Sequence, residues 1–237
     1  MEAEDHYDLD AVNGQLERCL DLEFYDGRVA PVDSWEAFRE LPLLTREEVF
    51  DSVAEDPPFG SLYREDVTLT TLTPAGQDSL LVEYSTEADL AAVGEEIGAV
   101  LRAAGIGQRD VVVSCFGYTP FAGGYLFHEG LRNVGANVFP LGPGEADRTA
   151  DIVEKYDVTG LLSPPSFAMD VAARGGTDVD TVVCSGEPFS VIPGYREQLK
   201  DAFGGATTVD YYGLSEVGPV AAEDGTEGAL YVRDSFV

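Results

Sequence analysis

Residues 207–218 read Thr-Thr-Val-Asp-Tyr-Tyr-Gly-Leu-Ser-Glu-Val-Gly, so a β-branched start runs into two tyrosines, a glycine, a hydroxyl and a carboxylate. The pattern predicts a strand at 207–209 that ends in a loop. In open α/β sheets, ligands bind beyond the carboxyl ends of the strands. An exposed tyrosine pair can stack there on a flat ring, and Glu216 offers Mg²⁺ a hard oxygen ligand. The alternative is a plain turn whose tyrosines pack in the core and whose glutamate is solvated.

The chain before this stretch alternates short apolar segments with helical patterns. Strands are predicted at 67–73, 79–85, 110–116, 136–141, 159–162 and 181–184, and a last edge strand at 229–232. Helices are predicted at 86–105, 124–134, 146–156, 166–173 and 191–203. Such alternation is typical of βαβ crossovers. We therefore predict an α/β fold with a mostly parallel sheet and flanking helices.

The first 60 residues follow a different pattern. Capping signatures begin short helices at Ser34 and Thr45, whereas residues before 30 suggest only an amphipathic turn or two. Pro57-Pro58-Phe59-Gly60 then breaks the chain. We predict a helical N-terminal lead-in at 1–60 and an α/β domain at 61–237.

The charge balance is extreme, with 44 acidic residues against 14 basic ones and a formal net charge of −30. Such a surface repels nucleic acid and anionic membranes, so neither is expected as a partner. Its self-repulsion is relieved by salt, which predicts a halophilic protein. Three widely spaced cysteines, no apolar run of about 18 residues and no signal peptide favour a cytoplasmic protein.

Other strand-end loops carry candidate chemistry. Residues 117–124 place glycines beside aromatics, which can form a flat apolar slot or simply a turn into a helix. The loop 141–145 could receive phosphate but contains no lysine. Residues 163–167 are predicted to form a strand-end turn with a helix N-cap, and His128 is interpreted as a structural histidine. The loop 185–188 lies one βαβ unit before 207–218, so the two loops should be neighbours at the sheet edge.

Four motifs taken in order resemble the phenylacetate–CoA ligase family, part of the AMP-forming adenylating superfamily. They are Gly-Tyr-Thr-Pro-Phe-Ala-Gly-Gly (117–124), Ser-Pro-Pro-Ser-Phe (163–167), Ser-Gly-Glu-Pro-Phe (185–189) and Asp-Tyr-Tyr-Gly-Leu-Ser-Glu-Val-Gly-Pro (210–219). Residues 41–46 and 228–236 are also similar to family segments.

The resemblance implies a carboxylic acid as substrate, with ATP or AMP, Mg²⁺ and CoA as cofactors. The residues it implies for the nucleotide are Ser185, Gly186, Glu187 and Pro188, with Asp210, Tyr211, Tyr212 and Gly213. Ser215 would face the α-phosphate and Glu216 would hold Mg²⁺, and these two are the candidate catalytic residues. The acyl or aryl pocket would be shaped by Tyr118, Phe121, Gly123 and Phe167.

The sequence also departs from the family. Residues 69–77 stand where the family has a glycine-rich phosphate loop with a lysine, and they lack both the glycine run and the lysine. The family's C-terminal domain with its catalytic lysine would lie beyond Val237, so we interpret the chain as truncated. One hypothesis is a ligase that works with a partner chain supplying that domain. Others are an inactive acyl- or nucleotide-binding module, or a remnant that assembles as a homo-oligomer or with another protein.

Overall fold

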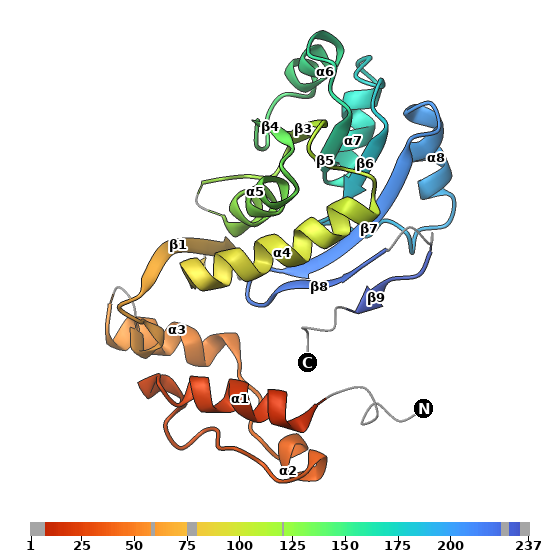
Figure 1. Ribbon diagram of the computed structural model, residues 1–237. Coiled ribbons are helices and arrows are strands. Elements are labelled where there is room, and N and C mark those ends of the chain that lie inside the picture. Colours follow the sequence, from red (N-terminus) through yellow and green to blue (C-terminus); the bar gives the residue numbers. More distant parts are fainter. Residues whose placement is uncertain (1–7, 58–59, 75–79, 120, 224–227, 233–237) are drawn as a thin grey trace. The chain divides into compact units, whose positions relative to one another are not determined.

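A computed structural model describes residues 8–57, 60–74, 80–119, 121–223 and 228–232 (Figure 1). The chain divides into two compact units. The first holds the described residues up to Thr70 together with those of Pro74–Tyr84, and the second holds Thr71–Thr73 and the described residues from Ser85 onward. Residue 60, where the sequence placed a domain boundary, thus lies within the first unit.

The first unit is mainly helical. It contains α1 (Leu9–Cys19), α2 (Trp35–Arg39) and α3 (Arg46–Glu55), and the 3₁₀ turns η2 (Glu23–Tyr25) and η3 (Gly60–Leu62). Its core is built on Phe24, Val49 and Leu81. The capping box predicted at Thr45 is present, because Thr45 and Glu48 bond each other's backbone N–H. The hydrogen bond from the Thr45 backbone contributes most to a Glu48 pKa lowered to about 2.

A separate two-stranded sheet pairs β1 (Val67–Pro74) with β2 (Leu80–Thr86). Thr86 then begins α4 (Glu87–Ala103) with a second capping box, in which Asp89 is the partner. The predicted strands and the long helix after them are therefore confirmed. Residues 75–79, which complete the segment compared with a phosphate loop, lie outside the described residues.

The second unit is built on a sheet in the order β4-β3-β5-β6-β7-β8-β9. Its parallel strands are β3 (Val111–Ser114), β4 (Asn137–Pro140), β5 (Gly160–Ser163), β6 (Thr181–Cys184) and β7 (Thr207–Leu214). The helices between them are α5 (Ala122–Val134), α6 (Ala146–Lys155), α7 (Pro165–Ala172) and α8 (Tyr195–Ala202). The mostly parallel α/β fold is confirmed.

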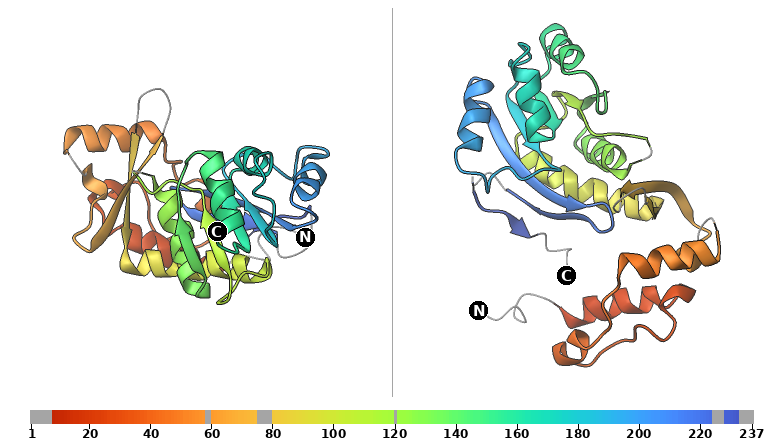
Figure 2. Two further views of the ribbon diagram at one scale, coloured as in Figure 1. Left: turned by 90° about the horizontal axis from the view of Figure 1, so that it is seen from above. Right: turned by 180° about the vertical axis from the view of Figure 1, so that it is seen from behind.

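Both faces of this sheet are covered by helices (Figures 1 and 2). Val112, Leu162 and Val183 pack with α4 and α5 on one face, whereas Val113, Leu161 and Val182 pack with α6, α7 and α8 on the other. Successive side chains of a strand point to opposite faces, so strands buried on both sides are continuously apolar. This explains the uninterrupted Val111-Val112-Val113 run.

The largest difference between the sequence prediction and the structure concerns the stretch at 207–218. The predicted strand 207–209 continues to Leu214 as β7, turns at 215–217 and returns as the antiparallel strand β8 (Gly218–Ala222). The antiparallel strand β9 (Tyr231–Val232) follows and is shorter than the predicted 229–232. The predicted helix 191–203 begins only at Tyr195, because Gly194 precedes it in the left-handed region with φ of 75°.

Candidate functional site

The carboxyl ends of the parallel strands gather the candidate loops at one edge of the sheet. β3 is followed by 115–121, β4 by 141–145, β5 by Pro164, β6 by 185–194 and β7 by the turn at 215–217. β6 and β7 are neighbours, with Cys184 opposite Asp210. The loop that begins at Ser185 therefore starts beside Asp210, the first residue of the stretch 210–216, as the sequence predicts.

The strand order also marks a switch point. From β3 the chain moves to β4 on one side and then crosses to β5 on the other. Ligands of open α/β sheets bind at such a point because the two flanking loops diverge to opposite faces. The loops concerned begin at Cys115 and Pro164, and both belong to motifs singled out in the sequence.

The loop after β6 is held on three sides. Ser185 is buried and its N–H donates to the Ser163 carbonyl at 3.3 Å. Glu187 is exposed, and its two oxygens accept from the Ser166 N–H at 3.1 Å and the Ser166 Oγ at 2.8 Å. Gly186 has φ of 83°, and a Cβ there would lie 3.9 Å from a ring carbon of Phe116. The loops after β3, β5 and β6 therefore meet beside Gly186 and Glu187.

The N-cap predicted within 163–167 makes no hydrogen bond from its own side chain. Pro164 occupies the N-cap position and makes no side-chain cap bond. The Glu187 carboxylate from the neighbouring loop instead accepts the Ser166 N–H in the first turn of the helix. A carboxylate at this position also complements the positive end of the helix dipole.

The two tyrosines of the central stretch point to opposite environments. Tyr211 is only 6% exposed, with its ring centroid 5.0 Å from that of Phe127, whereas Tyr212 is 47% exposed. The interpretation of an exposed tyrosine pair is therefore wrong, because residues at successive strand positions face opposite sides. A Cβ on Gly213 would lie 2.9 Å from the Tyr211 hydroxyl oxygen, so the glycine makes room for Tyr211.

Ser215 and Glu216 lie in the turn between β7 and β8, and Glu216 is exposed. Within the described part of the chain, no group of three or more His, Cys, Asp or Glu side chains is arranged to hold a metal ion. A single carboxylate still suits Mg²⁺, which keeps several waters and takes its other ligands from substrate phosphates. The chemistry of the Glu216 side chain is thus compatible with such an ion.

The four residues expected at the acid pocket fall into two groups. The Tyr118 hydroxyl lies 3.1 Å from His128 Nδ1 on α5, and Phe121 and Gly123 flank the start of that helix. Burial raises the pKa of Tyr118. Phe167 packs instead against Ala146, Ala150 and Val171, in the cluster formed by α6 and α7. The structure thus does not bring Phe167 into one packing cluster with the other three.

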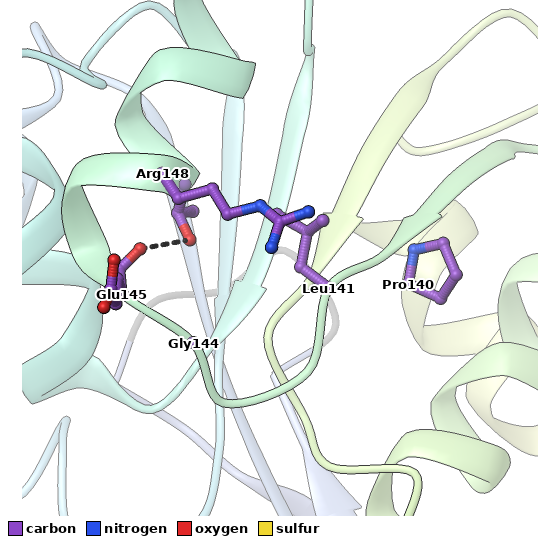
Figure 3. A pocket seen from close by; sticks show the side chains of 6 residues that line it. Pro140, Leu141, Gly144, Glu145 and Arg148 are labelled. Carbon is purple, nitrogen blue, oxygen red and sulfur yellow. Dashed lines mark hydrogen bonds between the residues drawn. The ribbon is translucent and has the colours of Figure 1, made fainter.

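Sequence reasoning missed several functional candidates. A cavity of about 440 Å³ lies at the end of β4, lined by Pro140, Leu141, Gly144, Glu145, Arg148 and Thr149. Figure 3 shows the Arg148 guanidinium reaching across it toward Leu141, while Glu145 points to the other side. The loop 141–145 was judged weak for phosphate because it lacks a lysine. Arg148 lies one helical turn further on and carries the positive charge that the loop lacks. A basic residue shortly after a glycine-rich loop was the sequence signal that could have indicated this cavity.

Arg196 and Glu223 were missed as well. They form an ion pair of 2.5 Å, and their side chains are 9% and 2% exposed. They are 27 residues apart in the sequence, so no local spacing identifies them.

Solved CoA ligases share this fold. The chain shares its fold with 2-hydroxyisobutyryl-CoA ligase in complex with 2-HIB-AMP and CoA, with a TM-score of 0.81 at 20% identity over 92% of this chain and 52% of that chain. The acyl-CoA synthetase of Brucella canis matches with a TM-score of 0.53 at 23% identity over 66% of this chain and 29% of that chain.

The sequence relatives are more specific. Phenylacetate-coenzyme A ligase of Escherichia coli (strain K12) is 26% identical over 211 residues, which are 84% of this chain and 47% of that protein. The protein of the same name from Thermus thermophilus is 26% identical over 76% of this chain and 43% of its own length. No family profile matches. These relatives support the phenylacetate–CoA ligase family, and the chain spans about half the length of the curated relatives it matches.

Among the described residues, none of the helices combines the length and apolar character required to cross a bilayer.

Proposed function

We propose that this chain binds ATP and a carboxylic acid and adenylates the acid, as a member of the phenylacetate–CoA ligase family. The observation that carries the proposal is the pairing of β6 with β7, which sets Cys184 opposite Asp210, so that the loop Ser185–Pro188 and the stretch Asp210–Gly213 start from neighbouring positions. In the reaction a carboxylate oxygen bonds to the α-phosphorus of ATP, the bond from that phosphorus to the bridging oxygen breaks, and pyrophosphate leaves. The CoA thiol then attacks the acyl carbon and AMP leaves.

The candidate residues have separate roles in binding adenine, the phosphates with Mg²⁺, and the acid. Tyr212 is an exposed ring available to stack on adenine, and the loop Ser185–Pro188 would line the adenine site with it. Ser215 donates to the α-phosphate, and Glu216 holds Mg²⁺ against the phosphates. A net charge of −30 repels ATP, so the site depends on that metal ion and on salt screening. Tyr118, Phe121 and Gly123 would border the acid, whereas Phe167 lies on α7 and packs toward α6.

Turnover needs further groups that the resemblance places beyond Val237, from this protein or from a partner chain. We also propose a cytoplasmic location, which three cysteines without disulfides support. A substrate panel of aryl and fatty acids will identify the acid.

Pyrophosphate exchange tests the proposal. With ATP, Mg²⁺ and the acid panel in molar KCl, we expect acid-dependent incorporation of labelled pyrophosphate into ATP. Glu216→Gln should lower it by at least about two decades, because a bound metal contributes several kcal/mol and each decade needs about 1.4 kcal/mol. Glu95→Gln, an exposed glutamate of α4, is the matched control and should have no effect. ATP or acid binding without any exchange would instead support the binding-module hypothesis.

The cavity beside Arg148 is our proposed site for the phosphates of CoA. It lies at the same edge of the sheet, and α6 begins there with no side-chain cap on its N–H groups. Arg148→Gln should weaken CoA binding roughly 10- to 100-fold, because a hydrogen bond to a charged group contributes about 1.5–3 kcal/mol.

Arg109 offers a matched control for this measurement. It is an exposed arginine in the turn before β3, at the opposite edge of the sheet. Calorimetric titration of CoA at one fixed KCl concentration should show weaker binding for Arg148→Gln and unchanged binding for Arg109→Gln. Equal losses in both variants would mean that only the overall charge matters and that the cavity is not the site.

A further inference from the structure

A buried polar network connects the two candidate nucleotide-binding segments, the loop 185–190 and the stretch Asp210–Gly213. The Arg196 guanidinium donates to the Thr208 carbonyl at 3.0 Å, to Thr208 Oγ1 at 2.9 Å and to Glu223 Oε1 at 2.5 Å. It also lies 4.9 Å from the ring centroid of Phe189, which is buried. Arg196 is therefore bonded to β7 and packed against the loop after β6 at the same time.

Glu223 continues the network into the central stretch. Its Oε2 accepts the Asp210 N–H at 2.8 Å, and its Oε1 also accepts the Gly228 N–H at 2.6 Å. The backbone bond from the Glu223 N–H to the Asp210 carbonyl, at 3.0 Å, fixes the same pair a second time. Glu223 thus sets the position of the residue that opens Asp210–Gly213.

Asp210 completes the connection. Its Oδ2 accepts the Ser190 N–H at 3.0 Å, and Ser190 lies two residues after Pro188. One chain of bonds therefore runs from Arg196 through Glu223 and Asp210 to the loop 185–190. All three side chains are at least nine-tenths buried, so this chain of bonds is shielded from solvent.

A buried ion pair is a weak source of stability, because apolar replacements of similar volume are often neutral or stabilising. The better-attested reason to keep such a group is that it specifies one arrangement among several. Here the arrangement specified is the position of the loop 185–190 relative to β7.

We propose that Arg196 and Glu223 are positioning residues for the nucleotide site: acting through Asp210 and Ser190, they hold the loop 185–190 at the distance from Tyr212 that adenine requires. This inference rests on the proposed function for its ligand. Its structural part, the ordering of that loop by the ion pair, stands on the contacts alone.

The test replaces both members of the ion pair at once, so that neither Arg196 nor Glu223 is left buried without its partner. Arg196→Met combined with Glu223→Leu should keep an unfolding temperature close to the wild-type value. Hydrogen exchange of the peptide covering 185–194 should accelerate at least tenfold in the ligand-free protein, while that of β5 stays unchanged. Calorimetric titration with ATP and Mg²⁺ should show an affinity at least tenfold lower. Unchanged exchange at 185–194 together with unchanged ATP affinity would overturn the proposal and leave a merely structural ion pair.

Two further results distinguish failure of this inference from failure of the proposed function. If the wild-type protein binds no ATP, the proposed function fails, and the exchange rates alone decide whether the pair orders the loop. If the double variant does not fold, Asp210→Ala and Asp210→Asn replace it. The asparagine amide oxygen still accepts from the Ser190 N–H, so exchange at 185–194 should accelerate in the alanine variant and be rescued in the asparagine variant. Equal exchange in both would contradict the proposal.

Discussion

Diluting KCl from 2 M to 0.1 M should lower the free energy of unfolding of this protein by roughly 5 kcal/mol, because a like-charge pair at 4 Å in water costs about 1 kcal/mol and many such pairs become unscreened. Fourteen basic residues can neutralise at most a third of the 44 acidic ones. The Debye length grows from under about 3 Å to about 10 Å over this range. For a chain of this size, the loss corresponds to roughly 10–20 °C in the unfolding temperature.

The control changes charge without touching the core. Glu95, Glu197 and Asp201 are exposed on helices, and lysine at all three raises the net charge by six, from −30 to −24. This variant should lose distinctly less stability on dilution than the wild-type protein. Unfolding temperatures measured by circular dichroism across a KCl series decide the matter. A flat profile for the wild-type protein would contradict both the self-repulsion argument and the proposed high-salt origin.

The architecture of the second unit was predictable because its signals are local. Val111-Val112-Val113 is continuously apolar because both faces of β3 are covered. Thr86 and Asp89 form a capping box that marks the start of α4 in the sequence. Each short strand is followed by a helix pattern of the right length for a crossover. Local propensity and the final fold agree here, which is the condition under which sequence patterns are informative.

The hairpin of β7 and β8 was not predictable in the same way. Gly213, Gly218 and Pro219 are loop signals in isolation, yet they stand on paired strands. Gly213 is needed because Tyr211 fills the space a side chain would take, and Gly218 has φ of 73°. Whether Tyr211 or Tyr212 faces the core depends on the pairing register, which the residues around them do not encode.

In the candidate site, too, some features follow from local sequence signals and others only from long-range contacts. The spacing of one βαβ unit predicts that the loop 185–188 neighbours the stretch that begins at Asp210, and the pairing of β6 with β7 agrees at Cys184 and Asp210. The groups that position these segments, Arg196 and Glu223, come from a helix and from the end of β8 and meet only in the fold. The hydrogen bonds from Ser166 to Glu187 are equally non-local, since Ser166 lies on α7 and Glu187 in the loop after β6. Long-range polar contacts of this kind leave no periodic trace in a sequence.

Replacing Gly124 by alanine should destabilise the protein by about 1–3 kcal/mol, the usual cost of overpacking a filled site. Gly124 lies in the first turn of α5, and its N–H donates to the Gly117 carbonyl at 2.8 Å. An added Cβ would overlap that carbonyl oxygen and lie 2.7 Å from its carbon, so the Gly117–Tyr118 backbone must move. Because Tyr118 borders the proposed acid site, acid affinity should fall as well.

Gly123 is the matched control for stability, because it lies in the same helical turn and its added Cβ would meet only Phe116 Cβ at 3.9 Å. Gly123→Ala should therefore stabilise the protein by about 0.5–1 kcal/mol through helix propensity alone. Urea unfolding of the two variants should give shifts of opposite sign in the midpoint. If both variants gained stability, the close approach of α5 to Gly117 would be absent in solution, and the loop 117–121 would not be held where the acid site requires it.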